Sequence, residues 1–189
     1  TRATKDGEDW ILNGAKMWIT NGSIADVAVV WANAGAEHGG VRGFVVPTNS
    51  PGFTAHPIKH KLSLRASVTA ELSLPHVRLP GAAVLPEVRG LKGPLACLSE
   101  ARFGIIWGAL GAARTCLETA RRYAIEREQF GKPLAGFQLT QAKLANMSTE
   151  LQLGMLLALH LGRRKDEVGL RPEQVSVGKY NNITKAIEI

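Results

Sequence analysis

The sequence predicts an α+β protein with two parts: an antiparallel β-barrel or sandwich domain over residues 1–90, then part of a helical bundle over residues 91–189. The first part contains short runs of branched and aromatic residues between Gly, Asn and Pro turn signals, with no helix-length pattern among them. The second part contains long segments in which apolar residues recur at helical spacing. The composition, 45% apolar and 21% charged, is ordinary for a globular protein.

Five short apolar runs in the first part are predicted to be strands. Asn-Gly between apolar runs is a strong hairpin signal, and it occurs at Asn13-Gly14 and Asn21-Gly22. Gly39-Gly40 is a further turn signal. We therefore expect neighbouring strands to pair in antiparallel hairpins. The five runs are residues 10–12, 16–20, 27–31, 43–46 and 70–74.

Three helices are predicted in the second part. Pro94 can open the first, whose pattern runs to about Glu126. Residues 138–164 form a second, which is apolar on more than one side and should be well buried. After Gly169, the pair Pro172-Glu173 begins a third.

The first helix has two notable features. Gly104, Gly108 and Gly111 give it a face of small residues that would allow close helix packing. Its uncharged apolar stretch, residues 103–113, is shorter than the ~20 residues of a membrane span, so we interpret it as a buried helix.

Charge and cysteine content narrow the functional classes. The net charge of +7 could suit nucleic acid, a membrane surface or an anionic small molecule. The basic excess is spread along helices rather than massed in a tail, which suits a phosphorylated ligand at least as well. Cys97 and Cys116 lack a close second pair or clustered histidines, so neither a disulfide framework nor a metal site is indicated and buried, reduced thiols are expected. His160, in an apolar helix, is interpreted as a core histidine.

The stretch from Arg127 to Leu134, followed by Gln138, is the leading candidate for a binding segment. It places a guanidinium, the Phe130 ring and a glycine turn between two helical patterns. The guanidinium can form paired hydrogen bonds with a phosphate, and the ring can cover a flat surface. We therefore expect it to hold an anionic, partly aromatic ligand.

Two further segments could contact a ligand. Trp18-Ile19-Thr20 ends a predicted strand, where the indole could stack on a ring and the hydroxyl could bond its edge; a core tryptophan beside a strand threonine is the simpler alternative. Arg102 leads into the glycine-faced helix and needs a partner, either Glu100 or a ligand phosphate or carbonyl. A helix-surface ion pair is the alternative for Arg102. The familiar phosphate-loop and dinucleotide motifs do not occur, so any cofactor must be held by another scheme.

These segments together resemble the acyl-CoA dehydrogenase flavoenzymes, and within that family the glutaryl-CoA branch. The Trp-Ile-Thr and Arg-x-x-Phe-Gly motifs, occurring in this order, are highly specific for the superfamily. The resemblance extends over essentially the whole chain. Its likeness to the glutaryl branch rests on the Leu64-Arg65-Ala66-Ser67 loop, the Ala101-Arg102-Phe103-Gly104 run, and Asn181-Asn182 with Lys185-Ala186.

The resemblance implies roles for individual residues. Trp18, Ile19 and Thr20 would line the isoalloxazine of FAD. Arg127, Gln129, Phe130 and Gln138 would hold the pyrophosphate and adenosine end of an FAD seated mainly on a neighbouring subunit. The implied acyl-CoA channel is lined by Leu98, Ser99, Glu100, Ala101, Arg102, Phe103, Gly104 and Ile105, with Arg102 near the pantetheine or phosphates of CoA. No metal is implied.

The resemblance also implies a reaction and partners. An acyl-CoA thioester would be dehydrogenated between its α and β carbons, with decarboxylation to crotonyl-CoA in the glutaryl branch, and electrons would pass to an electron-transfer flavoprotein. The implied whole enzyme adds an N-terminal helical domain and completes an up-down four-helix bundle. It is a homotetramer (dimer of dimers) in the bacterial cytoplasm or the mitochondrial matrix, with neither nucleic acid nor membrane as partner.

The catalytic base is expected outside this segment. In the family it is the Glu of a Tyr-Glu-Gly motif, expected beyond Ile189, and the position before Arg102 that some relatives use holds Ala101. The chain alone is therefore expected to be inactive. Three alternatives stay open: a short- or branched-chain acyl-CoA dehydrogenase, an acyl-CoA oxidase, and a non-catalytic DNA-binding or interaction relative with the same fold.

Overall fold

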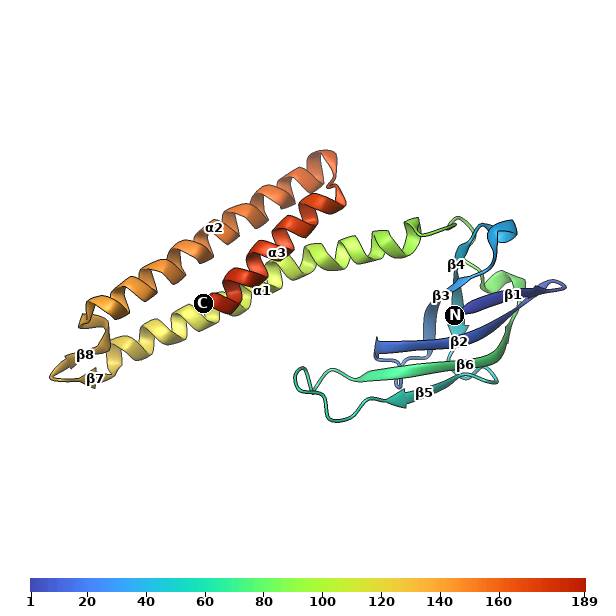
Figure 1. Cartoon of the computed structure of the whole chain (residues 1–189), viewed down its shortest axis with the longest axis horizontal. Coiled ribbons are helices and arrows are strands. Elements are labelled where there is room, and N and C mark those ends of the chain that lie inside the picture. The colour runs from blue at the N-terminus through green and yellow to red at the C-terminus, as the bar shows by residue number, and fades with distance from the viewer. The chain divides into compact units, whose positions relative to one another are not determined.

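The computed structural model describes residues 1–189. The chain divides into two compact units, Thr1–Leu95 and Ala96–Ile189. Strands form the first unit and helices dominate the second (Figure 1). The predicted fold class, a β domain followed by part of a helical bundle, is confirmed.

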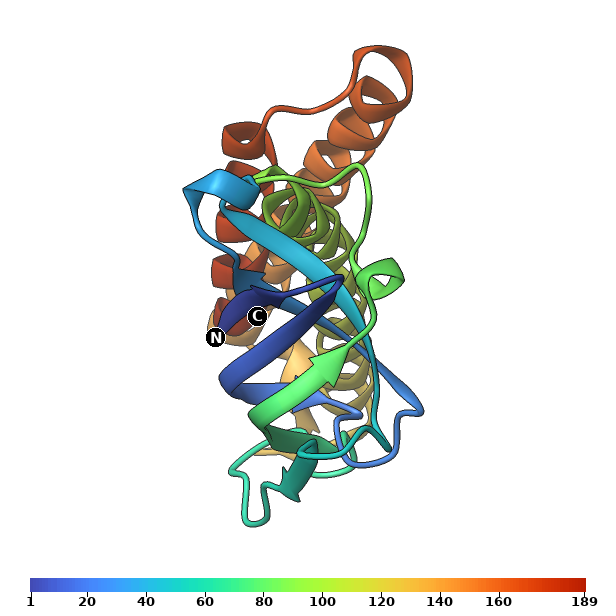
Figure 2. The same cartoon turned by 90° about the vertical axis from the view of Figure 1, so that its right-hand side faces the viewer.

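The first unit is built on one six-stranded sheet with the strand order β4-β3-β1-β2-β6-β5. All neighbouring strands pair antiparallel except β1 and β3, which are parallel at Arg2 and Asn33. Figure 2 gives a second view of the sheet. Its strands are β1 (Arg2–Asp6), β2 (Asp9–Thr20), β3 (Val27–Asn33), β4 (Val41–Pro47), β5 (Thr54–Pro57) and β6 (Thr69–Leu79).

Two of these strands, β1 and β5, were not predicted from the sequence. Within β1 only Ala3 is buried, and β5 has no fully buried residue. Their positions in the sheet are set by pairing with β2 and β6 rather than by an apolar run of their own. The sheet is mixed, not wholly antiparallel, because β1 lies between β2 and β3.

The predicted turn at Asn13-Gly14 is wrong, because β2 continues through both residues. The register between β2 and β6 shifts between Leu12 and Gly14, which marks a bulge. Asn13 Oδ1 accepts a hydrogen bond from the His76 backbone N–H at 2.9 Å. Gly14 has φ 143°, and a Cβ there would lie 2.7 Å from Thr1 Cα. The Asn-Gly pair therefore serves a bulge with a close backbone approach.

The core of the first unit is formed by apolar side chains of the strands and of the loops that pack on them. Trp10 is 5% exposed and meets Phe44 edge to face at 5.4 Å between ring centroids. Partly buried Phe53 and Val84 complete this core. Its buried members are Ala3, Trp10, Leu12, Val30, Ala32, Ala34, Phe44, Val46, Leu74, Val77 and Leu79.

The second unit contains three long helices, all of which the sequence predicted. They are α1 (Lys92–Glu126), α2 (Gln138–Val168) and α3 (Pro172–Glu188). Figure 1 shows α2 running back along α1 and α3 returning beside both. A short hairpin of β7 (Glu128–Gln129) and β8 (Lys132–Pro133) joins α1 to α2. The shared core is Ile106, Leu110, Ala113, Leu151, Ala158, Leu161 and Val175.

The glycines at which helices approach closely are not the predicted ones. A Cβ on Gly104, Gly108 or Gly111 would meet nothing within 4 Å. A Cβ on Gly154 of α2 would lie 2.7 Å from Leu110 Cδ2, and one on Gly178 of α3 would lie 2.7 Å from Ile106 Cδ1. The three helices therefore approach most closely where Gly154 of α2 and Gly178 of α3 pack against Leu110 and Ile106 of α1.

Asn182 links all three helices at this point. Its side chain is fully buried, and its Nδ2 donates to the carbonyls of Ile106 on α1 and Gly154 on α2, each at 3.3 Å. Its Oδ1 accepts a hydrogen bond from Asn181 Nδ2 at 3.0 Å. A buried amide that donates to carbonyls on two other helices fixes the register of the three helices, because a shift would leave these polar groups unpaired.

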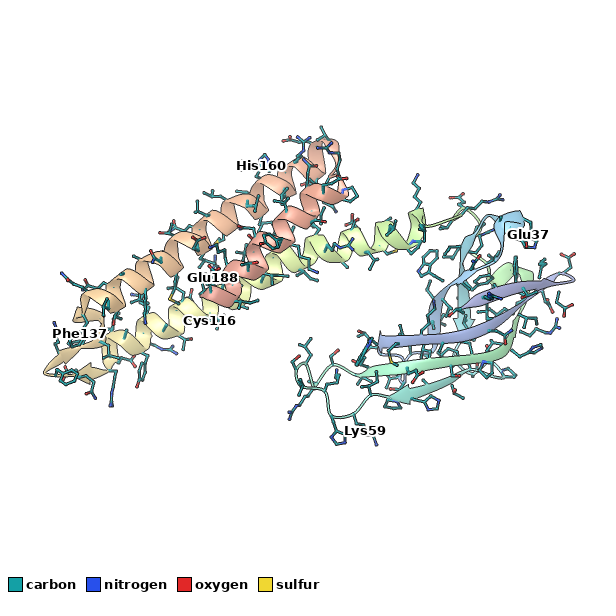
Figure 3. The ribbon with its side chains drawn as sticks, in the orientation of Figure 1. Glu37, Lys59, Cys116, Phe137, His160 and Glu188 are labelled. Atoms are coloured by element: carbon teal, nitrogen blue, oxygen red, sulfur yellow. The ribbon has the colours of Figure 1, made fainter.

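Several side chains predicted to be buried are exposed. Within α2, Leu153 and Leu156 are 55% and 63% exposed, and His160 lies on the exposed surface of the same helix (Figure 3). Cys97 and Cys116 are exposed free thiols. The three helices bury only one face each, so apolar residues on the other faces have no neighbour within the unit.

The same holds for α1, which was predicted to be a buried helix. Its most apolar window has a mean hydropathy of 1.2, and only 11% of that window is buried. By length and composition α1 is the one helix of the chain that could cross a membrane, although the core helix of a soluble protein passes the same test. The residues that α1 does bury are Ile106, Leu110, Ala113 and Ala124, and the first three belong to the core shared with α2 and α3.

Candidate functional site

The Trp18-Ile19-Thr20 segment forms an irregular end to β2. The register with β6 shifts between Lys16 and Ile19, and Trp18 has φ 62°. A left-handed backbone is a genuine outlier for a bulky residue. The indole of Trp18 is 66% exposed, so the alternative of a core tryptophan is wrong. The bulge rotates the indole out of the sheet and away from the apolar core.

The polar groups of this segment are free. Thr20 is exposed and its hydroxyl has no hydrogen bond within the chain; among residues 16–20 only Lys16 makes a side-chain hydrogen bond. Lys16 Nζ donates to the Trp31 carbonyl at 2.6 Å, and burial lowers the pKa of Lys16. The indole N–H and the Thr20 hydroxyl are therefore available to a ligand.

A second exposed aromatic lies in the hairpin between α1 and α2. Phe130 and Gly131 form its two-residue loop with φ 52° and 77°, the pair of positive values that a type I′ turn requires. The Phe130 ring is 92% exposed and its centroid is 6.5 Å from that of Phe137, edge to face. Lys132 Nζ lies 4.3 Å from the Phe137 ring centroid, at the start of α2 (Figure 3).

Arg127 stands at the base of this hairpin. Its carbonyl accepts the Leu134 N–H at 2.8 Å, which closes the hairpin, and its own N–H donates to the Tyr123 carbonyl. The guanidinium is exposed and has no hydrogen bond or ion pair in the chain. Gln129 and Gln138 are also exposed and unpaired, since the side-chain hydrogen bonds of this region are made by Lys132 and Gln141. The hairpin, together with Arg127 before it and Gln138 after it, thus carries one exposed ring and three polar side chains without a partner in the chain.

The predicted acyl-CoA segment occupies the N-terminal turns of α1. Ser99, Arg102 and Phe103 are half-buried, whereas Leu98, Glu100, Ala101, Gly104 and Ile105 are exposed. Arg102 has no carboxylate partner. It lines a cavity of ≈ 330 Å³ whose other walls come from α3, namely Ser176, Lys179, Tyr180, Ile183 and Thr184.

Glu100 is not the partner of Arg102. Its carboxylate bonds Lys165 Nζ of α2 at 2.8 Å, and the same ammonium lies 5.0 Å from the Phe103 ring centroid. The ion pair between Glu100 and Lys165 therefore links α1 to α2. Arg102 therefore keeps its guanidinium free for a ligand in the α1–α3 cavity.

The candidate residues fall into three groups. Trp18, Ile19 and Thr20 lie in the first unit, and the other two groups lie in the second. Arg102 and Arg127 are separated by about 25 residues of one helix, which corresponds to roughly 37 Å along its axis. The hairpin and the Arg102 cavity are therefore separate sites within the unit.

Two features of the candidate site were not predicted from the sequence. The first is the left-handed backbone of Trp18. It has no signal in the local sequence, because the bulge at Trp18 depends on the pairing of β2 with β6. The second is the hydrogen bond between Lys16 and Trp31, which joins strands that are not neighbours in the sheet. A lysine two residues before a strand-end tryptophan was the available clue.

The fold places the protein in a class in which a mixed six-stranded sheet is followed by long helices, with exposed aromatic rings and unpaired polar side chains in both parts of the candidate site. Family models place it more closely. The model described as the acyl-CoA dehydrogenase middle domain matches residues 1–77, and that of the acyl-CoA dehydrogenase C-terminal domain matches residues 89–189. The chain belongs to the acyl-CoA dehydrogenase family.

Individual relatives agree with this placement. A crystal structure of a glutaryl-CoA dehydrogenase from Mycobacterium smegmatis in complex with FADH2 is 64% identical with a TM-score of 0.95, over 99% of this chain and 48% of that one. The glutaryl-CoA dehydrogenase of Desulfococcus multivorans is 36% identical over 94% of this chain and 47% of its own length. The human mitochondrial short-chain specific acyl-CoA dehydrogenase is 39% identical over 88% of this chain and 41% of its own. The chain thus spans about half the length of these relatives.

Proposed function

We propose that this chain forms the flavin-facing and acyl-CoA-facing part of an FAD-dependent acyl-CoA dehydrogenase that acts on glutaryl-CoA. The observation that carries the proposal is the pair of exposed aromatic rings, Trp18 and Phe130, each held by a left-handed backbone beside unpaired polar side chains. The 64% identity to the Mycobacterium smegmatis enzyme supports the glutaryl branch.

The residues present fit FAD. A flat ring system suits the exposed indole of Trp18, and the free hydroxyl of Thr20 can bond its polar edge. A diphosphate suits the unpaired guanidinium of Arg127, which can form two parallel hydrogen bonds, and the amides of Gln129 and Gln138 add further donors. When bound, FAD would accept the hydride that leaves the β-carbon of the acyl thioester.

Each group of residues has its own task in this proposal. Trp18 to Thr20 cover one face of the ring system and exclude water from it. Arg102, free in its cavity beside Lys179, supplies positive charge to the CoA moiety. The hairpin lies roughly 37 Å from Arg102 along α1, so we assign it to the FAD of a second copy of the chain. An electron-transfer flavoprotein is the proposed electron acceptor.

Binding of FAD tests the cofactor assignment. The chain is titrated with FAD while flavin fluorescence is followed. Loss of the guanidinium in Arg127→Ala should weaken binding about tenfold or more, as expected for a charge-assisted hydrogen bond. Arg163→Ala, which removes an exposed arginine at the far end of α2, is the matched control and should bind like wild type. Equal affinity in the two variants would contradict the role of Arg127.

A panel of acyl-CoA esters tests the substrate. Glutaryl-CoA should perturb the spectrum of bound flavin at lower concentration than butyryl-CoA or isovaleryl-CoA. Arg102→Ala should weaken all three esters by a similar factor, because its proposed contact is with their shared CoA part. Any turnover should need an electron acceptor, and peroxide formed without one would point instead to an acyl-CoA oxidase.

A further inference from the structure

The end of β2 is supported by strands on one side only. On one edge, β2 pairs with β6 from Trp10 to Thr20. On the other edge, its ladder with β1 stops at Asn13, opposite Arg2. Residues 14–20, here called the distal arm, therefore lie beyond that ladder, and the next strand, β3, touches β1 only where Arg2 pairs with Asn33.

Lys16 connects the distal arm to β3. Its Nζ reaches from the arm to the Trp31 carbonyl at 2.6 Å, between strands that are not neighbours in the sheet order. Trp31, which supplies the acceptor, packs closely against two glycines. A Cβ on either Gly43 or Gly93 would lie 2.8 Å from the Trp31 ring. The one other side-chain link to this edge of the arm is the Thr1 hydroxyl, which donates to the Ala15 carbonyl at 3.1 Å.

The charge of Lys16 is maintained without a counter-ion. None of the salt bridges in the chain includes Lys16. Burial lowers its pKa, so holding the ammonium in this place opposes stability. Lys16 lies one residue before the point at which the register with β6 becomes irregular, at Met17 and Trp18. Because its buried charge opposes stability, we look for a role of Lys16 other than stabilising the fold.

We propose that Lys16 is a positioning residue that ties the distal arm to β3 and thereby fixes the left-handed bulge that presents Trp18, Ile19 and Thr20. A bulge interrupts the ladder, so the regular hydrogen bonds to β6 do not by themselves set its conformation. The Lys16 bond supplies the missing constraint from the opposite edge. The consequence for flavin binding rests on the proposed function.

Fluorine NMR of the full chain labelled with 5-fluorotryptophan tests the positioning role. The signal of Trp18 is assigned with Trp18→Phe. In Lys16→Met, the Trp18 signal should broaden or split, because the arm samples several conformations, while the signals of Trp10 and Trp107 stay unchanged. The matched control is Lys5→Met, which removes a lysine of the same sheet that also donates to a carbonyl, that of Glu8 at 2.7 Å. It should leave Trp18 unchanged.

An unaltered Trp18 signal in Lys16→Met would overturn the proposal, and so would an equal change in Lys5→Met. A change at Trp10 as large as that at Trp18 would show general loosening of the sheet, and would also overturn it. These outcomes do not depend on FAD.

Titration with FAD then tests the link to function. The dissociation constant should rise about tenfold in Lys16→Met and stay at the wild-type value in Lys5→Met. If the Trp18 signal splits and the affinity for FAD does not change, Lys16 positions the bulge but the bulge does not serve the flavin. If wild type binds no FAD, the proposed function fails while the NMR result still decides the positioning role.

Discussion

At Trp18 and Phe130, large aromatic side chains occupy backbone conformations that glycine adopts more easily. A non-glycine residue in such a conformation costs on the order of 1–3 kcal/mol and persists only where the surroundings enforce it. Both rings are mostly exposed, so neither returns this cost by packing in the core. The strain is explained if the rings are placed for a ligand.

Replacement of Trp18 by glycine tests this explanation through stability. Glycine accepts φ 62° without strain, and the indole buries little surface, so Trp18→Gly should leave the free energy of unfolding unchanged or raise it by up to about 1 kcal/mol. Trp10→Ala, at a core position, should lower it by about 3–5 kcal/mol. Urea denaturation followed by circular dichroism measures both. A large loss in Trp18→Gly would mean that the indole is a packing residue.

In the helical unit, Asn182 is the single residue whose side chain joins all three helices. It is fully buried and donates to carbonyls on two other helices. Asn182→Leu keeps similar volume but leaves those carbonyls and the Asn181 amide without this partner, which should lower the free energy of unfolding by about 1–3 kcal/mol. Asn181→Leu, at a more exposed position, should cost less. Hydrogen exchange of α3 amides would report the same difference locally, and equal losses would contradict a specific role for Asn182.

At the scale of the elements, the helices contain glycines at close contacts and glycines on open faces. Gly178 lies where the side chains of Ile106 and Leu161 fill the space for a Cβ, whereas Gly108 has nothing within 4 Å. The same residue type therefore serves close packing in α3 and an open face in α1. The neighbouring residues Ile105 and Trp107 of α1 are also exposed.

Paired alanine substitutions should have opposite effects in the two helices. Gly108→Ala should raise the free energy of unfolding by about 1 kcal/mol, because alanine favours the helix and meets no neighbour. Gly178→Ala should lower it by about 1–3 kcal/mol, because the methyl group overpacks the core. Thermal denaturation distinguishes them by the direction of the shift in Tm. A destabilising Gly108→Ala would imply that the α1 face is packed in solution, for example against a second copy.

At the scale of the whole molecule, the two units should respond differently to alkaline pH. Burial lowers the pKa of Lys16 below 10.5, so its folded state releases the proton first and stability rises as pH increases through that lowered value towards 10.5. In the second unit, the hydrogen bond to Glu188, with the nearby charge of Glu150, raises the pKa of Lys185 above 10.5. Its contribution is fully present below 10.5 and is lost as pH rises through the raised value.

Urea denaturation from neutral to alkaline pH checks these signs. The stability of wild type relative to Lys16→Met should increase with pH below about 10.5, while that of wild type relative to Lys185→Met should stay level there and fall above it. Trp10 reports on the first unit and Trp107 on the second. A parallel pH dependence of the two differences would contradict the assignment of the shifts.

The proposed division of the flavin site between copies also belongs to this scale. If Trp18–Thr20 meet one FAD and the Arg127 hairpin meets another, a single chain holds two half-sites. The affinity for FAD should then increase with protein concentration in step with association, which analytical ultracentrifugation with and without FAD would detect. Concentration-independent binding by a monomer would contradict the shared site.

Much of this could be predicted from the sequence, because it depends on local physical chemistry. The periodicity of apolar residues placed α1, α2 and α3, with Pro94 and Pro172 near their starts and Gly169 after the second. The residue types of the Arg127–Gln138 segment predict a ligand with a phosphate and a ring, which stays a prediction, whereas the exposure of these side chains is what the structure adds. The Phe130-Gly131 turn followed from its glycine and its position between two helices.

What only the tertiary structure decided depends on contacts between segments that are distant in the sequence. The Asn13-Gly14 pair looks like a turn locally, yet pairing with β6 makes it a bulge; the same pairing turns Trp18 outward. Burial of Leu153, His160 and the α1 face was overestimated, since periodicity shows that a face is apolar but not whether the chain itself supplies a neighbour. The sequence therefore determined which groups have the chemistry proposed for a flavin nucleotide, whereas contacts between distant segments determined which of those groups are exposed and unpaired.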